Sequence, residues 1–201
     1  MKSIVITGGT GDLGSIVVPR LATDYRCAVV YRSEESRKRL AESDRVVAVP
    51  DGGDVAAFAP VYGLVLLAGG FAGGSTAADV ERMLEVNLLS AVRAIDAVRP
   101  HLASPGRIIA ISSAASLAKP AGLAAYTAAK AALNAYVETL AKDLKEKAVT
   151  VNALLPTALD TGGKRSTTER LVKRENVAEM IALLLSDQAS NVSGQLIAMS
   201  A

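Results

Sequence analysis

The chain has 201 residues and a mass of 20.7 kDa, which suits one domain with a buried core. Its 22 basic and 20 acidic residues nearly balance and form no long run, which argues against nucleic acid as a partner. A single cysteine, Cys27, excludes a disulfide or cysteine metal cluster, and no apolar run approaches the ~18 residues that span a bilayer. The first strand begins without room for a signal peptide, so we expect a cytoplasmic protein with no metal and no membrane partner.

Short apolar runs alternate with helical segments along the whole chain, and no linker interrupts them. Apolar runs bounded by Gly, Pro or Asp are typical of buried strands, and longer amphipathic stretches are typical of helices. In the first half we expect strands at Lys2–Thr7, Arg26–Tyr31, Arg45–Val49 and Leu64–Ala68, with helices at Leu13–Ala22, at Glu34–Glu42 and, for a short stretch, from Asp54.

Two long helical patterns, Thr76–Val98 and Leu123–Lys147, dominate the second half. Helical spacing places on their inner stripes Met83, Leu84, Leu88, Val92 and Ile95 in the first and Leu133, Val137, Leu140 and Leu144 in the second. The remaining expected elements are strands at Arg107–Ser112, Thr150–Leu155 and Gln195–Met199 and a helix at Val177–Leu185.

This alternation of strands and helices predicts the fold class. Right-handed crossovers between successive strands build a doubly wound parallel sheet of about seven strands with helices on both faces, a three-layer α/β/α arrangement. Aromatic residues make up only 3% of the chain, so the core must consist of Ala, Val, Leu and Ile, which suits buried parallel strands. We expect residues 1–201 to form a single Rossmann-like domain that carries both cofactor and substrate sites.

A glycine-rich turn, Thr7–Gly14, follows the first strand. Gly8 allows a sharp exit from the strand, Gly11 lets a phosphate approach the backbone, and Gly14 lets the helix pack closely on the sheet. Free amides at the start of that helix would face a pyrophosphate. The glycines could merely punctuate a turn, but their place between a strand and a helix favours nucleotide binding.

The end of the second strand carries the residues that distinguish NADP from NAD. An NAD enzyme places a carboxylate there for the ribose hydroxyl, whereas an NADP site favours a cation. The strand ends in Arg32 and Ser33, with no carboxylate before Glu34. Arg32 can pair with a 2′-phosphate and Ser33 can add a donor, which favours NADP(H) over NAD(H). The alternative is that Arg32 only opens a solvated helix.

Ser113, Tyr126 and Lys130 form a possible acid–base centre. Tyr126 and Lys130 lie about 40° apart on one helix face, one turn from each other. An ammonium beside a phenol stabilises the phenolate and lowers a pKa that is otherwise near ~10. A nearby hydroxyl, Ser113, could hold a carbonyl oxygen while the phenol exchanges its proton. The pair alone is weak evidence, because chance supplies one in a chain of this composition about one time in five.

Together these motifs make the chain, from Lys2 to Met199, resemble a short-chain dehydrogenase/reductase. Asp51 is similar to the family's acidic residue near the adenine, and Asn87 to its Asn in the fourth helix. Ser113, Tyr126 and Lys130 match its catalytic Ser and Tyr-x-x-x-Lys. The resemblance implies Asn87, Ser113, Tyr126 and Lys130 as catalytic residues. It also implies, together with Arg32 and Ser33, a cofactor site built by Gly8, Thr10, Gly11, Asp12, Leu13, Gly14, Asp51, Ala68, Gly69, Gly70, Tyr126, Lys130, Pro156, Thr157, Leu159 and Thr161.

The resemblance also implies the activity: hydride transfer between a nicotinamide and a small carbonyl or alcohol substrate, with Tyr126 as acid and base. Asn87 would hold a water that extends a proton path from Lys130. Members of this family usually associate through two long helices, which implies a homodimer or homotetramer through Thr76–Val98 and Leu123–Lys147. Phe71, Leu117, Leu123 and Leu159 are candidate walls of an apolar substrate pocket, although each could equally belong to the core.

Several positions depart from the family pattern. Asp12 replaces a glycine of the turn, Leu66 and Leu67 replace two Asn after the fourth strand, and Thr157 stands where Gly is common. The stretch 157–175, which forms much of the substrate lid, is short and implies an open pocket or one completed by a neighbouring subunit. Two alternatives remain. The loop 68–74 and the stretch 155–161 resemble quinoid dihydropteridine reductase, and the fold could also serve a catalytically silent NADP-binding regulator.

Overall fold

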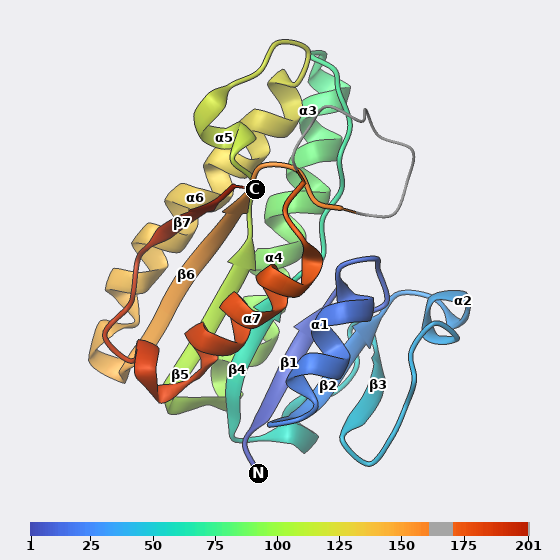
Figure 1. Ribbon diagram of the computed structural model, residues 1–201, viewed down its shortest axis with the longest axis vertical. Helices are drawn as coiled ribbons and strands as arrows, with labels where there is room; N and C mark the ends of the chain where they lie inside the picture. The colour runs from blue at the N-terminus through green and yellow to red at the C-terminus, as the bar shows by residue number, and fades with distance from the viewer. Residues whose placement is uncertain (161–170, 201) are drawn as a thin grey trace.

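The computed structural model describes residues 1–160 and 171–200, and within them one seven-stranded parallel sheet organises the chain. The strand order is β3-β2-β1-β4-β5-β6-β7. The chain therefore winds outward from β1 in one direction, then crosses to β4 and winds outward in the other, as expected for a doubly wound fold (Figure 1). The strands are β1 Ser3–Thr7, β2 Arg26–Tyr31, β3 Val46–Pro50, β4 Val61–Leu66, β5 Leu102–Ile111, β6 Val149–Pro156 and β7 Leu196–Met199.

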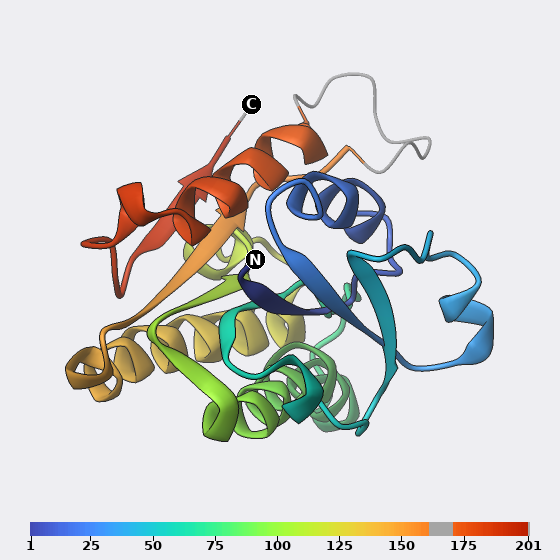
Figure 2. The same cartoon turned by 90° about the horizontal axis from the view of Figure 1, so that it is seen from below.

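Helices cover both faces of the sheet and form the three predicted layers (Figure 2). Helices α1 and α7 pack side by side on one face, whereas α3, α4 and α6 cover the other. The α-helices are α1 Gly14–Leu21, α2 Glu34–Arg37, α3 Ala77–Leu84, α4 Ser90–Val98, α5 Ala115–Ala118, α6 Ala124–Asp143 and α7 Arg174–Leu185, with 3₁₀ turns η1 Ala56–Phe58, η3 Arg99–His101, η4 Lys145–Lys147 and η5 Asp187–Ala189.

The core consists of aliphatic side chains on each side of the sheet, as the composition requires. Ile4 and Ile6 of β1 and Leu21 of α1 are fully buried on one side of the sheet, and Leu133 and Val137 of α6 are buried on the other. Cys27 is a fully buried small core residue of β2, and burial raises the pKa of its thiol to about 12.

The first long helical pattern is interrupted by a π-turn, η2 Glu85–Leu89, between α3 and α4. The prediction of one continuous helix is wrong, and Leu84, Leu88 and Val92 of the expected stripe are only partly buried, although Leu84 and Leu88 still pack against the core. The wider π-turn changes the phase of the helix by part of a turn. The face that packs on the sheet and on α6 consists instead of Met83, Asn87, Ala91, Ile95 and Val98.

Other boundaries also differ from the sequence prediction. The charged helix expected at Glu34–Glu42 ends at Arg37, because no residue of α2 is buried and no packing supports a longer helix. Strand β4 begins at Val61 rather than Leu64 and ends at Leu66 rather than Ala68, and β5 begins at Leu102 rather than Arg107. The pairing of Val61 with Leu102 begins both strands earlier than expected, and the register shifts between Val61 and Gly63.

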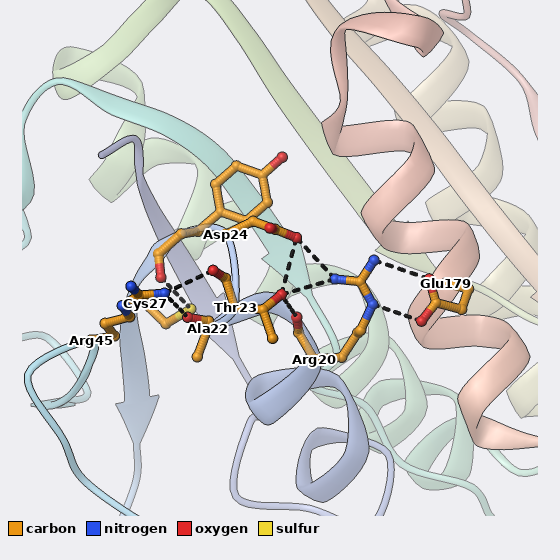
Figure 3. A network of polar contacts seen from close by, with 8 residues as sticks. Arg20, Ala22, Thr23, Asp24, Cys27, Arg45 and Glu179 are labelled. Carbon is orange, nitrogen blue, oxygen red and sulfur yellow. Dashed lines mark hydrogen bonds and ion pairs between the residues drawn. The ribbon is translucent and has the colours of Figure 1, made fainter.

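Arg20 joins the two helices that cover one face of the sheet (Figure 3). Its guanidinium donates from Nε and Nη2 to the two carboxylate oxygens of Glu179 in α7, at 2.6 and 3.0 Å, and from Nη1 to Asp24 at 3.0 Å. These bonds lower the pKa of both carboxyl groups. The bidentate pair links α1 to α7, although solvent screening keeps its contribution to stability small.

Candidate active site

Helix α6 carries Tyr126 and Lys130 on one face, and Lys130 is the more deeply buried of the two. Its side chain is 4% exposed, and its Nζ donates to the carbonyl of Ile111 at the end of β5 at 2.8 Å. Burial lowers the pKa of Lys130 to about 8, because the ammonium loses its hydration. The same Nζ lies 5.9 Å from the centroid of the Tyr126 ring, so the predicted pair is brought together.

Ser113 lies two residues after the end of β5, in the segment that leads into α5. It is 6% exposed, and its Oγ accepts a hydrogen bond from the amide of Ala115 at 3.2 Å. That bond uses a lone pair of Oγ and leaves the hydroxyl proton available to a bound molecule. The ring of Tyr126 packs against the exposed ring of Phe71 in a T-shaped contact, with the centroids 5.0 Å apart and the planes at 75°.

Asn87 lies inside the π-turn and is 1% exposed. Its Oδ1 accepts from the amide of Gly70 at 3.1 Å, and its Nδ2 donates to the carbonyls of Gly70 and Met83 at 3.0 and 3.1 Å. A Cβ on Gly69 would lie 2.9 Å from Asn87 Oδ1 and 3.4 Å from Lys130 Nζ. The absence of a side chain at Gly69 therefore leaves a space bordered by both polar groups.

The glycine turn has the geometry of a phosphate cradle. Gly8 has a φ of 70°, and a Cβ there would lie 2.5 Å from the amide nitrogen of Ala68; a Cβ on Gly14 would lie 2.3 Å from the carbonyl oxygen of Gly9. Within the described residues, the amides of Asp12, Leu13 and Gly14 donate to no protein acceptor. Unpaired amides at a helix start are suited to the pyrophosphate of a dinucleotide, so these residues fit the predicted cofactor.

The other predicted cofactor residues lie along the same edge of the sheet, where the strands end. Thr7 pairs with Val30 and with Leu66, so β1, β2 and β4 end level with one another. Arg32, Ser33 and Asp51 follow β2 and β3 and are exposed, Ala68–Gly70 follow β4, and Pro156 ends β6, followed by Thr157 and Leu159. Ser33 also caps α2, because its Oγ accepts from the amide of Ser36 at 3.2 Å. Thr161 and most of the shortened lid lie outside the described residues.

Comparison with known proteins identifies the family. A family model described as enoyl-(acyl carrier protein) reductase matches residues 53–201. The 3-oxoacyl-[acyl-carrier-protein] reductase MabA of Mycobacterium tuberculosis is 29% identical, over 98% of this chain and 90% of its own length. A short-chain dehydrogenase of Burkholderia cenocepacia, solved in complex with NADP, superposes with a TM-score of 0.86 at 27% identity, covering 99% of this chain and 96% of that chain. The chain is a short-chain dehydrogenase/reductase.

Two further relatives are similar to this dehydrogenase/reductase over almost its whole length. The cyclic-di-GMP-binding biofilm dispersal mediator protein of Escherichia coli is 32% identical, over 97% of this chain and 94% of its own length. A blue fluorescent protein from a metagenomic library, solved in complex with NADPH, superposes with a TM-score of 0.86 at 27% identity, covering 98% of this chain and 96% of that chain. Among the described residues, no helix is long and apolar enough to cross a membrane.

The positions where this family member departs from the usual pattern have structural roles of their own. The carbonyl oxygen of Asp12, in the glycine turn, accepts a hydrogen bond from Arg174 Nη1 at 3.0 Å, which ties the turn to the start of α7. Leu66 is buried at the end of β4, and the amide of Leu67 extends the pairing by donating to the carbonyl of Thr7 at 3.0 Å. Apolar side chains therefore replace the two Asn without interrupting the sheet.

Helix α6 also carries a buried polar residue, Asn134, that was not predicted as part of the site. Asn134 is 5% exposed, and its Nδ2 donates to Ser116 Oγ in α5 at 2.8 Å. Its signal is visible in the sequence, because Tyr126, Lys130 and Asn134 follow one another at intervals of four and thus share a helix face. The short helix α5 was not predicted either, so nothing in the sequence indicated a partner for Asn134.

Proposed function

We propose that this short-chain dehydrogenase/reductase transfers hydride between NADP(H) and a small carbonyl or alcohol substrate. The observation that carries the proposal is the position of Lys130: a buried ammonium, anchored to Ile111, beside the ring of Tyr126 and next to the loop of Ser113. A buried cation is costly unless something uses its charge, and here the phenol that it faces is the natural proton donor.

Each polar group has a distinct role in this proposal. The bound nicotinamide supplies or accepts the hydride. Tyr126 protonates the carbonyl oxygen during reduction, or removes the alcohol proton during oxidation, and the charge of Lys130 stabilises its phenolate. Ser113 donates a hydrogen bond to the substrate oxygen and polarises it. The space beside Gly69 suits a water that links Asn87 to Lys130 and returns the proton to solvent.

NADP(H) is proposed in preference to NAD(H). Arg32 is exposed immediately after β2, where its guanidinium could meet a 2′-phosphate, and the next carboxylate, Glu34, accepts from the hydroxyl of Tyr31 at 2.9 Å. The structural relatives solved with NADPH and NADP support the same choice.

Apolar residues beside the site favour a substrate with an apolar portion. Phe71 is 61% exposed and Leu117 is 57% exposed. Exposed apolar side chains that gather near a site can mark a ligand-binding surface. Neither belongs to the core, and both lie near the Tyr126 and Ser113 segments. Because MabA is named as a 3-oxoacyl reductase, a 3-oxoacyl thioester is the first substrate class to test.

The experiment measures the loss of nicotinamide absorbance when the purified protein is mixed with NADPH and each member of a panel of carbonyl compounds. The panel contains acetoacetyl-CoA as a 3-oxoacyl thioester, an aryl ketone, an aliphatic aldehyde and quinonoid dihydropterin. We expect reduction of at least one of the first three, faster with NADPH than with NADH. Turnover of dihydropterin alone, with NADH preferred, would instead favour the dihydropteridine reductase alternative.

A non-enzymatic regulatory role is the second candidate. It is favoured by the similarity to the Escherichia coli relative, which is named as a cyclic-di-GMP-binding mediator protein. In that case the protein would bind NADPH tightly, reduce no member of the panel, and bind cyclic di-GMP in a calorimetric titration. A chain that has Asn87, Ser113, Tyr126 and Lys130 has little need of all four for binding alone, so we retain the enzyme as the first candidate.

Self-association is proposed through the outer faces of α4 and α6. Leu89, at the start of that face, is 41% exposed, and α6 presents Ala124, Ala128, Ala131 and Ala135, which permit close approach of a second copy. We expect a dimer or tetramer in size-exclusion chromatography with light scattering. Replacing Leu89 with Asp should shift the protein toward the monomer, and elution of the unaltered protein at monomer mass would refute the prediction.

A further inference from the structure

Side chains of α6 donate hydrogen bonds to the chain on both sides of Ser113. Lys130 Nζ donates to the carbonyl of Ile111, two residues before Ser113, and Asn134 Nδ2 donates to Ser116 Oγ, three residues after it, each at 2.8 Å. Lys130 and Asn134 lie one turn apart, on the face that also carries Tyr126. The two bonds therefore bracket Ser113 and join it to the helix that presents Tyr126.

The hydrogen bonds of Ser116 have a fixed direction. Ser116 Oγ lies 2.6 Å from the carbonyl oxygen of Ser113 and must donate its only proton there, because a carbonyl cannot donate. Ser116 Oγ is then an acceptor toward Asn134, so the amide nitrogen of Asn134 must face it. The result is a directed chain from Asn134 through Ser116 to the main chain of Ser113.

The three residues joined by these hydrogen bonds are all buried: Ser116 is 3% exposed, Asn134 5% and Ser113 6%. Within the described residues, Asn134 Oδ1 has no hydrogen-bond partner. An unpaired buried acceptor destabilises the folded state, a cost that an apolar residue of similar size would avoid. Packing alone therefore gives a poor account of an amide at this position.

We propose that Asn134 and Ser116 are positioning residues, which hold the hydroxyl of Ser113 at the correct distance from Tyr126. The inference rests on the proposed function, because it assigns them to the reaction in which Ser113 and Tyr126 act on one substrate oxygen. Neither residue touches the substrate or the cofactor. Their contribution is to restrict the motion of the short segment that carries Ser113. A displacement of a reacting group by about 1 Å can lower the rate by up to about 100-fold.

The test compares Ser116→Ala, Asn134→Leu and the double variant with the unaltered protein. With the carbonyl probe that the protein reduces best, each single change should lower kcat by about 10- to 100-fold and leave the Kd for NADPH unchanged. Because the two residues act in series, the double variant should lose no more than the larger single loss. Ser116→Thr keeps the hydroxyl and should retain most of the rate.

Asn152 in β6 supplies a matched control. It is also buried, at 1% exposed, and its Nδ2 donates to the carbonyl of Val192 at 2.8 Å while its Oδ1 accepts from Gln195. These bonds tie β6 to the segment before β7. Asn152→Leu should therefore lower the melting temperature by a similar amount to Asn134→Leu, without the loss of kcat.

Crystal structures of the same variants separate this inference from the proposed function. We expect the distance between Ser113 Oγ and Tyr126 Oη to change in Ser116→Ala and Asn134→Leu but not in Asn152→Leu. This readout requires no turnover, so it applies even if the carbonyl panel shows no activity and the proposed function fails. An unchanged distance, multiplicative losses in the double variant, or a fall in melting temperature with kcat intact would overturn the inference.

Discussion

Replacing Tyr126 with Phe is expected to lower kcat by about 10²- to 10⁴-fold, the usual contribution of a positioned general acid or base. The variant removes only the phenolic oxygen and keeps the ring that meets Phe71 edge-on, so the fold and the apolar contacts of the site remain. The Kd for NADPH should stay nearly unchanged, since the glycine turn and Arg32 are untouched. Steady-state kinetics with the best carbonyl probe, together with a calorimetric NADPH titration, measure both quantities.

Tyr136→Phe is the matched control for this prediction. Tyr136 lies on the same helix and is partly buried, and burial raises the pKa of its hydroxyl, but it faces the core rather than the Ser113 loop. We expect full activity from this variant. A Tyr126→Phe protein that kept most of its rate would remove Tyr126 from the acid–base role and with it the proposed mechanism.

Replacing Lys130 with Met is expected to abolish turnover and also to change how stability depends on pH. In the folded protein the pKa of Lys130 is lowered from 10.5 to about 8 by burial. Below about pH 8 the ammonium is charged in both states, so the folded state bears the full cost of burying it. Between about pH 8 and 10.5 the unfolded chain holds a proton that the folded chain has released, so stability rises with pH.

The difference in free energy of unfolding between the unaltered protein and Lys130→Met should therefore shift in favour of the unaltered protein as pH rises from 8 to 10.5. A shift from 10.5 to about 8 corresponds to on the order of 3 kcal/mol over that range. Urea unfolding at several pH values, without cofactor, measures it. Lys142→Met, at an exposed position on the same helix, is the matched control for removal of a lysine. A constant difference for Lys130→Met would mean that the side chain is hydrated in solution.

The features that could be predicted from the sequence are those governed by local spacing. Alternating apolar runs predicted the parallel sheet, because buried parallel strands must be apolar on both faces. The glycines at positions 8, 11 and 14 predicted the turn, since few other residues permit that backbone. The pair Tyr126 and Lys130 predicted a shared helix face, because an interval of four residues nearly completes one turn.

The π-turn marks the limit of that approach. A period of 3.6 residues places Leu84 and Leu88 on the buried stripe, but the wider turn at Glu85–Leu89 brings Asn87 inward instead. Asn87 compensates for the disturbed backbone by bonding the carbonyls of Met83 and Gly70. Nothing in the hydrophobic pattern predicts this change, because the stabilising partner, Gly70, lies in the loop between β4 and α3.

The sequence by itself therefore determined the fold class, the place of the glycine turn and the helix face shared by Tyr126 and Lys130, because short-range spacing controls each of these. Only the tertiary structure decided that Lys130 is buried against Ile111, which lowers its pKa, and that Asn134 reaches Ser113 through Ser116. Hydration and the direction of a hydrogen bond depend on atoms that distant segments bring together, and those are set when β5, α5 and α6 pack.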